Sequence, residues 1–384
     1  MTSEVALPSR NRRVRLGIVG TGLAVEKLHW PALAQLTDRF EVVAFANDTR
    51  EPAEKFAREA GLPMDGYHAD YHALLRRDDV AAVLVALPIP LLYPVARAAL
   101  EAGKEVLSEK PPGSNLDQAR DFLALGEQFP GRRILVGENF FYRDDLRLAR
   151  SLLDAGAIGR VHLMAWRNVF HLVPREGQFS GTPWRWAPMY RGGPQLDAGV
   201  HHIAQIRLLC GDVEDLHGYV QYANPTHGGP SDLVLNMHFV SHAIGSFTAA
   251  HLAIPAPGET NEMRLYGSDG VLAVGGRMRR REVALLRPDG SSERQTVEAD
   301  GGYYNEWLNF HDAIVHDEPI VGTIAQSYHN LLLVMRALDS AEERRMIEIA
   351  DAPGGLSEAG VPLWRPRGAT GLFEGLPCKI AGAK

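Results

Sequence analysis

The sequence predicts an α/β plus α+β protein, in which a doubly wound parallel sheet is followed by an open-faced, mostly antiparallel sheet. Three observations support this fold class. The chain has 384 residues, which is too long for one small core. Its first part alternates short apolar runs with helical periodicity, as parallel sheets with crossover helices do. Its second part contains longer runs in which apolar and polar residues alternate, as in half-buried strands.

The composition excludes several classes of protein. Hydrophobic residues make up 45% and charged residues 23% of the chain, and the formal net charge is -7. This acidic balance, without a dense basic stripe, predicts no nucleic-acid partner. Cys210 and Cys378 are far apart and form no zinc spacing, so we expect no metal site and a reducing, cytoplasmic location. No apolar stretch is long enough to span a bilayer, so no membrane partner is expected.

The first predicted element pair is a strand at Val14–Val19, a turn at Gly20-Thr21-Gly22 and a helix at Leu23–Leu36 that Pro31 kinks. Such a turn lets the backbone approach a pyrophosphate, and the helix N-terminus supplies amide donors. Val25 stands where the full fingerprint has its third glycine, so this motif needs support from its context.

That context is a regular alternation of elements. Strands are predicted at Val42–Ala46, Ala82–Leu87, Glu105–Ser108 and Ile134–Gly137, and helices at Pro52–Ala60, Leu91–Ala102 and Leu116–Phe129. Asn47 and Asp48 follow the second strand, where an acid that binds the adenosine ribose is expected. A carboxylate there would repel a 2′-phosphate, which favours NAD, whereas Arg50 nearby keeps NADP as the alternative.

The strand at Glu105–Ser108 ends in an unusual sequence, Ser108-Glu109-Lys110-Pro111-Pro112. A solvated turn would explain these residues, but Lys110 would also emerge at the carboxyl edge of the sheet, where ligands bind. The chain must turn sharply to aim Lys110 at a ligand. Because a cis peptide bond is accessible mainly before proline, we expect Lys110–Pro111 to be cis.

The second part begins with a helix at Asp144–Asp154. Strands are then predicted at Val161–Phe170, His217–Tyr222, Leu233–Val240, Ser246–Leu252, Met263–Tyr266 and Val283–Leu286, and helices within Gly192–Gly211 and at Tyr303–His316 and Ala325–Leu338. From Pro353 onward the chain reads as a tail that packs across a neighbouring surface or stays loose. One sheet face would remain uncovered, which predicts a homodimer or homotetramer.

Asp197 and His201 are four residues apart, so a continuous helix would place them on one face. A carboxylate beside an imidazole can support proton transfer near neutral pH, although an isolated pair of this kind is more often structural. The preceding loop contains Trp184-Arg185-Trp186 and Tyr190-Arg191. Aromatic faces and guanidinium donors suit a polyhydroxylated ring, although tryptophan equally often anchors a core.

Three motifs together resemble the glucose-fructose oxidoreductase, inositol dehydrogenase and rhizopine-catabolism (Gfo/Idh/MocA) family. They are Gly20-x-Gly22, Glu109-Lys110-Pro111, and Gly192-Gly193 leading to Asp197-x-Gly199-x-His201. The resemblance, which covers residues 14 to 350, implies an arm at 1–13, a Rossmann domain at 14–138, a sheet domain for substrate binding and oligomerisation at 139–352, and a tail at 353–384. It also implies NAD(P)-dependent hydride transfer at a secondary hydroxyl or keto group of a sugar, glycoside or cyclitol.

The resemblance further implies a catalytic set of Lys110, Asp197 and His201. His201 would act as general acid/base, Asp197 would set its tautomer and bind a neighbouring hydroxyl, and Lys110 would hydrogen-bond the reacting oxygen. Cofactor binding is expected at Gly20, Thr21, Gly22, Leu23, Ala24, Asn47, Asp48, Arg50, Leu87, Pro88, Glu109, Lys110 and Asn139. Substrate binding is expected at Lys110, Trp184, Arg185, Tyr190, Asp197, His201 and His202.

Four residues depart from the usual pattern of this family: Ile89, Leu92, Phe141 and Ala204. They predict a more apolar pocket than a generic sugar site. Two other functions are compatible with the resemblance. One is glycoside cleavage or epimerisation through transient oxidation, in which the cofactor is recycled, and the other is a non-catalytic nucleotide-binding regulator.

Overall fold

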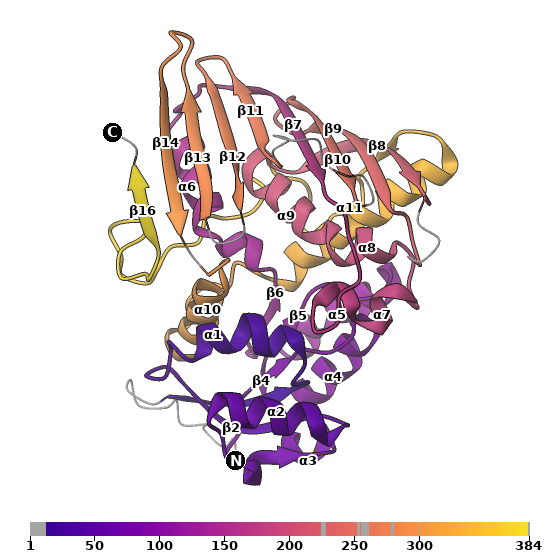
Figure 1. Ribbon diagram of the computed structural model, residues 1–384, viewed down its shortest axis with the longest axis vertical. Helices are drawn as coiled ribbons and strands as arrows, with labels where there is room; N and C mark the ends of the chain where they lie inside the picture. Colours follow the sequence, from indigo (N-terminus) through magenta and orange to yellow (C-terminus); the bar gives the residue numbers. More distant parts are fainter. Residues whose placement is uncertain are drawn as a thin grey trace.

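Two β-sheets organise the computed structural model, which describes residues 13–223, 228–251, 254, 261–277, 280–298 and 300–382. Figure 1 shows the sheet of the N-terminal region below and a larger sheet above it, with helices between them. The chain thus forms a parallel-sheet domain and a second domain with a mostly antiparallel sheet, which confirms the predicted fold class.

The first sheet has six parallel strands in the order β3-β2-β1-β4-β5-β6. These strands are β1 (Val14–Val19), β2 (Phe40–Ala46), β3 (Tyr67–His68), β4 (Ala82–Val85), β5 (Glu105–Glu109) and β6 (Ile134–Gly137). The order reverses beside β1, and at such a switch point the carboxyl ends of the strands leave a crevice for a ligand. The two-residue strand β3 was not predicted because it is too short to show a pattern.

Helices cover both faces of this sheet. They are η1 (Val25–His29), α1 (Trp30–Leu33), α2 (Arg50–Ala60), the single turn η2 (Met64–Gly66), α3 (Tyr71–Leu75), α4 (Ile89–Glu101) and α5 (Leu116–Gln128). Burial on both faces is clearest in β4, where Leu84 faces one hydrophobic cluster and Val83 and Val85 face the other. This explains why β4 reads as a continuous apolar run.

The helix predicted over Leu23–Leu36 is less regular than expected. A π-helical turn, η1, precedes the short α-helix α1. Pro31 lies in the first turn of α1 and has no backbone N–H, so it cannot continue an α-helical ladder from the preceding turn. The proline therefore interrupts the helix, as its position in the sequence suggests.

The second sheet has ten strands in the order β15-β8-β9-β10-β7-β11-β12-β13-β14-β16. Only β7 and β10 pair in parallel, and the other neighbours are antiparallel. The strands are β7 (Val161–Val169), β8 (Val213–Gln221), β9 (Asp232–Phe239), β10 (Ile244–Ala250), β11 (Met263–Gly267), β12 (Val271–Arg277), β13 (Arg280–Leu286), β14 (Ser292–Glu298), β15 (Ile347–Glu348) and β16 (Lys379–Gly382).

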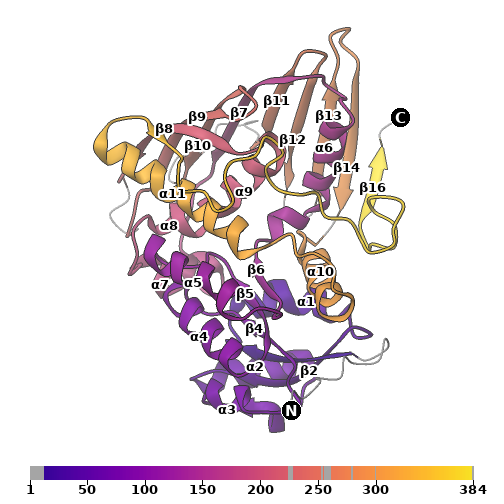
Figure 2. The ribbon, with the colours of Figure 1, turned by 180° about the vertical axis from the view of Figure 1, so that it is seen from behind.

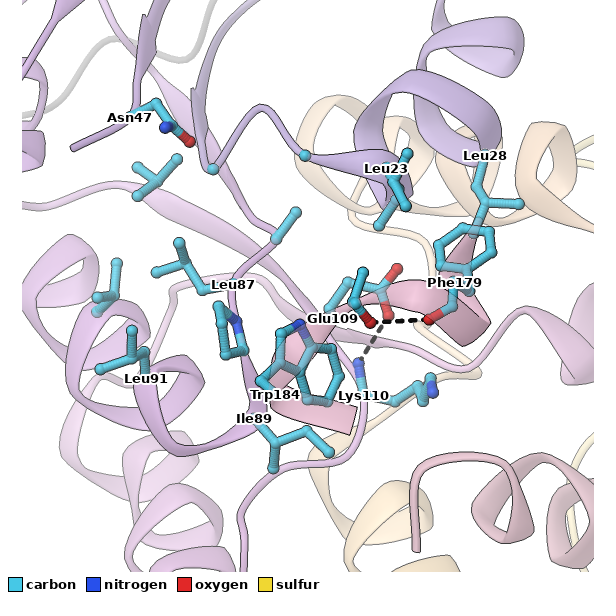
Figure 3. Close-up of a pocket in the computed structure, with 18 of the residues that line it drawn as sticks. Leu23, Leu28, Asn47, Leu87, Ile89, Leu91, Glu109, Lys110, Phe179 and Trp184 are labelled. Carbon is cyan, nitrogen blue, oxygen red and sulfur yellow. Dashed lines mark hydrogen bonds between the residues drawn. The ribbon is translucent and has the colours of Figure 1, made fainter. Parts of the chain in front are cut away.

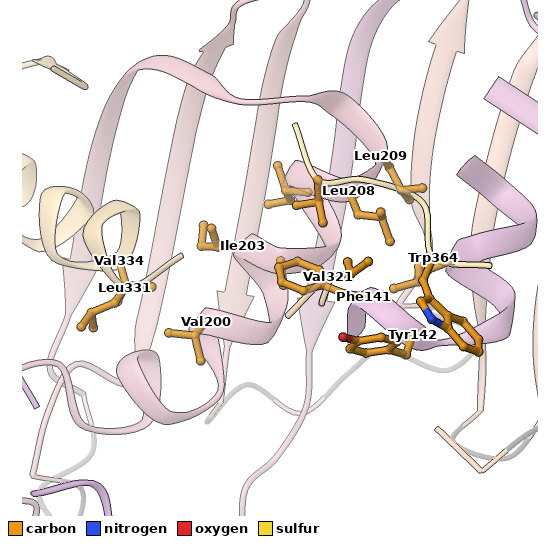
Figure 4. Packing of buried hydrophobic residues seen from close by; sticks show 14 of the residues in the cluster. Phe141, Tyr142, Val200, Ile203, Leu208, Leu209, Val321, Leu331, Val334 and Trp364 are labelled. Carbon is orange, nitrogen blue, oxygen red and sulfur yellow. The ribbon is translucent and has the colours of Figure 1, made fainter. Parts of the chain in front are cut away.

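One face of this sheet is covered by α6 (Asp144–Asp154), α9 (Gly199–Cys210) and α11 (Ile324–Glu343), as the two opposite views show (Figures 1 and 2). Figure 4 shows the core that these elements share, in which Val200 and Ile203 of α9 lie near Val334 and Leu331 of α11. The opposite face is open. Side chains of β9 alternate between buried and exposed, as the period-two pattern predicts.

The segment after residue 352 packs onto the second domain. The buried side chain of Arg147 in α6 bonds Asp144 and donates hydrogen bonds to the carbonyl oxygens of Trp364 and Leu372. Trp364 is itself buried, and β16 pairs with β14 at the sheet edge. This region is thus packed rather than loose over the residues that the structure describes.

Candidate active site

A cavity of about 910 Å³ lies between the two domains. Its walls come from the carboxyl ends of β1, β4 and β5, from the segment containing η4 (Phe179–Gly181) and α7 (Pro183–Trp186), and from the starts of α9 and of α10 (Tyr303–His316). Figure 3 shows Leu23, Leu28 and Phe179 close together, and Leu87, Ile89 and Trp184 on another part of the wall, with Lys110 between them.

The glycine turn after β1 can accommodate a dinucleotide. Gly20 has φ +90°, and a Cβ atom there would lie 2.2 Å from the carbonyl oxygen of Ala86, so only glycine fits. A Cβ on Gly22 would meet no atom within 4 Å, so the backbone at this position is open to the cavity. The backbone N–H of Thr21 donates to Asn47 Oδ1 at 3.2 Å, which fixes the turn against the end of β2. These features fit close approach of a pyrophosphate.

The residues after β2 extend the cavity away from Lys110. Asn47 and Asp48 line it, together with Ala69 and Tyr71. Arg50 does not line the cavity, because its guanidinium bonds Glu54 at 2.7 Å within α2. Asp48, rather than Arg50, therefore lines this end of the cavity.

Lys110 and Asp197 join the two domains. Lys110 Nζ donates to Asp197 Oδ1 at 3.0 Å and to the Asp197 carbonyl oxygen at 2.7 Å, while Arg185 Nε donates to Asp197 Oδ2 at 2.7 Å. Burial alone would raise the pKa of Asp197, but the charges of Lys110 and Arg185 outweigh burial and hold that pKa below its usual range. The Lys110–Pro111 peptide bond is cis, which confirms the prediction.

The expected pairing of Asp197 with His201 is wrong. Asp197 ends the helix α8 (Gly193–Asp197), Ala198 lies between the two helices, and His201 belongs to the first turn of α9. The two side chains therefore do not share the face of one continuous helix. Both carboxylate oxygens of Asp197 instead accept hydrogen bonds from cations.

His201 has a different partner, Glu138, which directly follows β6. His201 Nδ1 lies 2.6 Å from Glu138 Oε1, and the imidazole stacks on the ring of Phe140 with a centroid separation of 4.7 Å. Phe140 belongs to η3 (Asn139–Tyr142), and the guanidinium of Arg143 covers its ring. Sequence reasoning missed Glu138 because it is 63 positions from His201, and no local pattern connects them.

A second histidine supports the other side of the site. Trp307 Nε1 donates to His29 Nδ1 at 3.2 Å, so His29 Nε2 carries a proton and donates it to Glu109 Oε1 at 2.8 Å. Burial opposes ionisation of Glu109, yet the hydrogen bond from His29 and the charge of Lys110 hold its pKa below the usual range. Tyr303 lines the cavity and packs edge-on against His29.

Most of the predicted site residues line the cavity. These are Gly20, Gly22, Leu23, Ala24, Asn47, Asp48, Leu87, Pro88, Glu109, Lys110, Trp184, Arg185, Asp197 and His201. Thr21, Arg50, Asn139, Tyr190 and His202 do not line it.

Three of these five residues make contacts outside the cavity or line another one. His202 points to the second sheet, where its Nε2 lies 2.7 Å from Asn168 Nδ2 and its ring meets Trp166 edge-on. Tyr190 lines a separate small cavity behind Asp197. Asn139 donates its amide hydrogen to the carbonyl of Gly301. We therefore do not retain His202 or Tyr190 as substrate contacts.

Four departures from the family pattern were expected to make the pocket more apolar, and this prediction is wrong for three of them. Ile89 lines the cavity, but Leu92, Phe141 and Ala204 are buried in the hydrophobic cores. Apolar wall residues that the sequence did not single out are Leu28, Leu91 and Phe179. Their helical or loop positions carry no signal that separates pocket residues from core residues.

Neither a metal cluster nor a membrane span is found within the described ranges. No group of three or more histidine, cysteine, aspartate or glutamate side chains there is arranged to hold a metal ion. None of the helices described is both long and apolar enough to cross a membrane.

A glycine turn that fits a dinucleotide lines the same cavity as Lys110 and His201, which indicates an NAD-binding oxidoreductase. Family models agree: residues 14–136 match the oxidoreductase family with NAD-binding Rossmann fold, and residues 146–273 match the GFO/IDH/MocA C-terminal domain. The chain belongs to the Gfo/Idh/MocA family of oxidoreductases, as the motifs in its sequence suggest.

Similar proteins include a reductase that is named for a sugar substrate. The dTDP-3,4-didehydro-2,6-dideoxy-alpha-D-glucose 3-reductase of Streptomyces violaceoruber is 30% identical over 74% of this chain and 80% of its own length. An uncharacterized protein of Saccharomyces cerevisiae is 27% identical over 85% of this chain and 96% of its own. An oxidoreductase of Thermotoga maritima, whose crystal structure has a TM-score of 0.78, is 27% identical and covers 88% of this chain and 98% of its own.

Proposed function

We propose that the protein is an NAD-dependent dehydrogenase or reductase that acts on a secondary hydroxyl or keto group of an uncharged sugar, glycoside or cyclitol. The observation that carries this proposal is the position of Lys110, Asp197 and His201 in the same cavity as the glycine turn. The Lys110 ammonium has three N–H donors, and two of them bond Asp197. The third remains for the oxygen of the reacting carbon.

The roles of the chain's own residues follow from this geometry. A bound nicotinamide would supply the hydride acceptor or donor. Lys110 stabilises the negative charge that develops on the reacting oxygen, and His201 removes or returns the hydroxyl proton. Asp197 orients Lys110 and Arg185 instead of setting the tautomer of His201.

The charges around the cavity favour an uncharged substrate. Lys110 and Arg185 are the cations that line it among the described residues, and both bond Asp197. A substrate carboxylate or phosphate would have to compete with Asp197 for them. Trp184 lines the cavity, and an aromatic ring there suits the apolar face of a sugar. The Cζ atom of Arg185 lies 4.0 Å from the centre of the Trp184 ring. The relative from Streptomyces is named for reduction of a sugar ring that is linked to dTDP, so it supports a sugar ring as the reacting group and does not bear on the charge of the substrate.

NAD is the proposed cofactor in preference to NADP. Asp48 lines the cavity after β2, and its carboxylate would repel a 2′-phosphate. Arg50 is held by Glu54 and does not face the cavity.

The proposed function is tested by measuring reduction of NAD⁺ with a panel of neutral sugars, glycosides and cyclitols. The Lys110→Ala and His201→Asn variants should each lower kcat by about two to four orders of magnitude, the usual contribution of a positioned acid or base. Equal rates in the wild type and Lys110→Ala would contradict the catalytic assignment. Products should also be identified by mass spectrometry, because a new product without net change in nicotinamide would indicate cleavage or epimerisation.

The open face of the second sheet supports a homodimer or homotetramer. Tyr219 and Ile244 on this face are 59% and 49% exposed, and Val234 and Leu163 lie in the neighbouring strands. Exposed apolar side chains on a sheet face that no helix covers are typical of an interface. Replacing Tyr219 and Ile244 with lysine should reduce the molar mass measured by light scattering to that of a monomer, and unchanged mass would exclude this face.

A further inference from the structure

We propose that Glu138 is the positioning residue for His201, holding the ring proton on Nδ1 so that Nε2 serves as the proton acceptor in the cavity. This inference rests on the proposed function, in which His201 is the general acid/base. Glu138 is 1% exposed, and its Oε1 lies 2.6 Å from His201 Nδ1.

The hydrogen bonds of Glu138 identify the tautomer. Glu138 Oε1 also accepts the backbone N–H of Phe140 at 3.2 Å, so this oxygen acts as an acceptor. The ring nitrogen that faces it must therefore be the donor, which makes Nδ1 the protonated nitrogen of a neutral His201. Nε2, on the far edge of the ring, is then left with a lone pair. His201 lines the cavity, so this lone pair is available to a substrate hydroxyl.

The imidazole of His201 is also restrained by a stacking contact on its face. The rings of Phe140 and His201 are stacked, with an angle of 16° between their planes. The Cζ atom of Arg143 also packs on Phe140 and lies 4.4 Å from the centre of its ring. Arg143 is itself paired with Asp145. Rotation of the imidazole would break both the bond to Glu138 and the stack. Glu138 and Phe140 belong to one short segment, so a single connection between the domains holds the base.

The proton and electron balance of the step is simple. During oxidation the substrate O–H bond breaks and its proton joins Nε2, while the C–H bond electrons leave as hydride for the nicotinamide. The product is a ketone, and His201 becomes an imidazolium ion. Its Nδ1–H remains bonded to Glu138, whose carboxylate compensates the new positive charge in a buried setting.

A second buried acid provides an internal comparison. Glu306 of α10 is fully buried, and neither of its carboxyl oxygens has a hydrogen-bond partner within the described residues. Burial, and then the charges of Glu109 and Glu138, raise the pKa of Glu306 well above its usual value. The neutral form of Glu306 is therefore favoured in the folded protein. Replacing it removes a neighbouring carboxyl without touching the acceptor of His201.

The experiment compares Glu138→Leu, Glu138→Gln and the matched control Glu306→Leu. The tautomer of His201 is read from ¹⁵N chemical shifts of the ring, with the signals assigned by their loss in His201→Asn. Wild type and E306L should carry the proton on Nδ1. E138L lacks the acceptor and should shift the proton to Nε2, whereas E138Q keeps an acceptor oxygen and should retain the wild-type tautomer.

Activity provides the second measurement. E138L should lower kcat by about 10²- to 10⁴-fold, and E138Q should fall between E138L and wild type because it has lost the compensating charge. The dissociation constant for NAD⁺ should change less than about twofold, because Glu138 does not line the cavity. If E138L does not fold, the tautomer in E138Q still decides the matter, since a proton on Nε2 of His201 in E138Q, despite the retained acceptor oxygen, would overturn the proposal.

Two outcomes separate this inference from the proposed function. A wild-type tautomer in E138L, or the same tautomer change in E306L, would overturn the role of Glu138. The tautomer measurement needs no substrate. Correct tautomers with no turnover of any alcohol would therefore refute the proposed function and leave the positioning by Glu138 supported.

Discussion

Lys110 Nζ lies 3.0 Å from Asp197 Oδ1, and this contact joins the end of β5 in one domain to the end of α8 in the other. The aspartate also binds Arg185. One buried carboxylate thus fixes two cations at the cavity wall, and its removal has consequences for both.

Asp197→Asn should lower kcat/KM by at least about 10²-fold, because Lys110 loses the charge that orients it toward the reacting oxygen. The affinity for NAD⁺, measured by fluorescence titration, should change little. Asp117→Asn, which affects an exposed ion pair with Arg120, is the control. Wild-type kcat/KM in Asp197→Asn would show that this orientation is not needed.

Asp48→Ala should weaken binding of NADH by roughly tenfold, a loss of about 1.4 kcal/mol. It should leave binding of NADPH unchanged or improve it, because the repulsion of the 2′-phosphate is removed. Titration of cofactor fluorescence measures both constants. Arg50→Ala should leave the NADH constant unchanged, since Arg50 bonds Glu54 instead of facing the cavity. A larger effect of Arg50→Ala than of Asp48→Ala would reverse the assignment.

Glu306 should make stability depend on pH. Its folded-state pKa is raised above the usual 4.5, so the contribution of this group is fully present below pH 4.5 and is lost as pH rises toward the folded pKa. Glu306→Gln should therefore show a smaller decline in unfolding free energy from pH 5 upward. Denaturant titrations at several pH values measure this slope, and Glu127→Gln on the exposed side of α5 is the control. An unchanged slope in Glu306→Gln would mean that Glu306 is ionised in the folded protein.

Arg147→Ala should lower the free energy of unfolding by about 3 to 5 kcal/mol, because it leaves the buried Asp144 without its charge partner. It also removes the donors to the carbonyls of Trp364 and Leu372. Arg120→Ala breaks an exposed pair and should cost less than about 1 kcal/mol. Chemical denaturation measures both changes, and equal losses would show that burial of Arg147 does not matter.

Much of the fold could be predicted because its signals are local. The run Ala82–Val85 is apolar throughout because β4 is buried on both faces, and β9 alternates because one of its faces is open. Strand β14 was missed because its residues are mostly polar, and its pairing with β13 and β16 depends on distant segments. Periodicity alone could not indicate such an exposed strand.

The candidate site was predictable to the extent that each residue type has chemistry of its own. Lys110 at a strand end and Asp197 near His201 could be read from the chain, and all three line the cavity. The hydrogen-bond partners of the site residues could not be predicted from the sequence. Glu138 reaches His201 only through packing of the two domains, and His29 reaches Glu109 only through packing within the first domain. A break at Ala198 separates Asp197 from His201.

The second sheet ends in very short strands, with two residues in β15 on one side and four in β16 on the other. An edge strand offers unpaired backbone groups to other chains, and a short edge offers few of them. At the margin formed by β16, the sheet is therefore protected against lateral growth into aggregates, whereas β15 covers only Asp215 and Leu216 of β8. The C-terminal segment thus covers the edge of β14 as well as packing on the second domain, so shortening the chain before β16 would expose backbone groups of Gln295–Glu298.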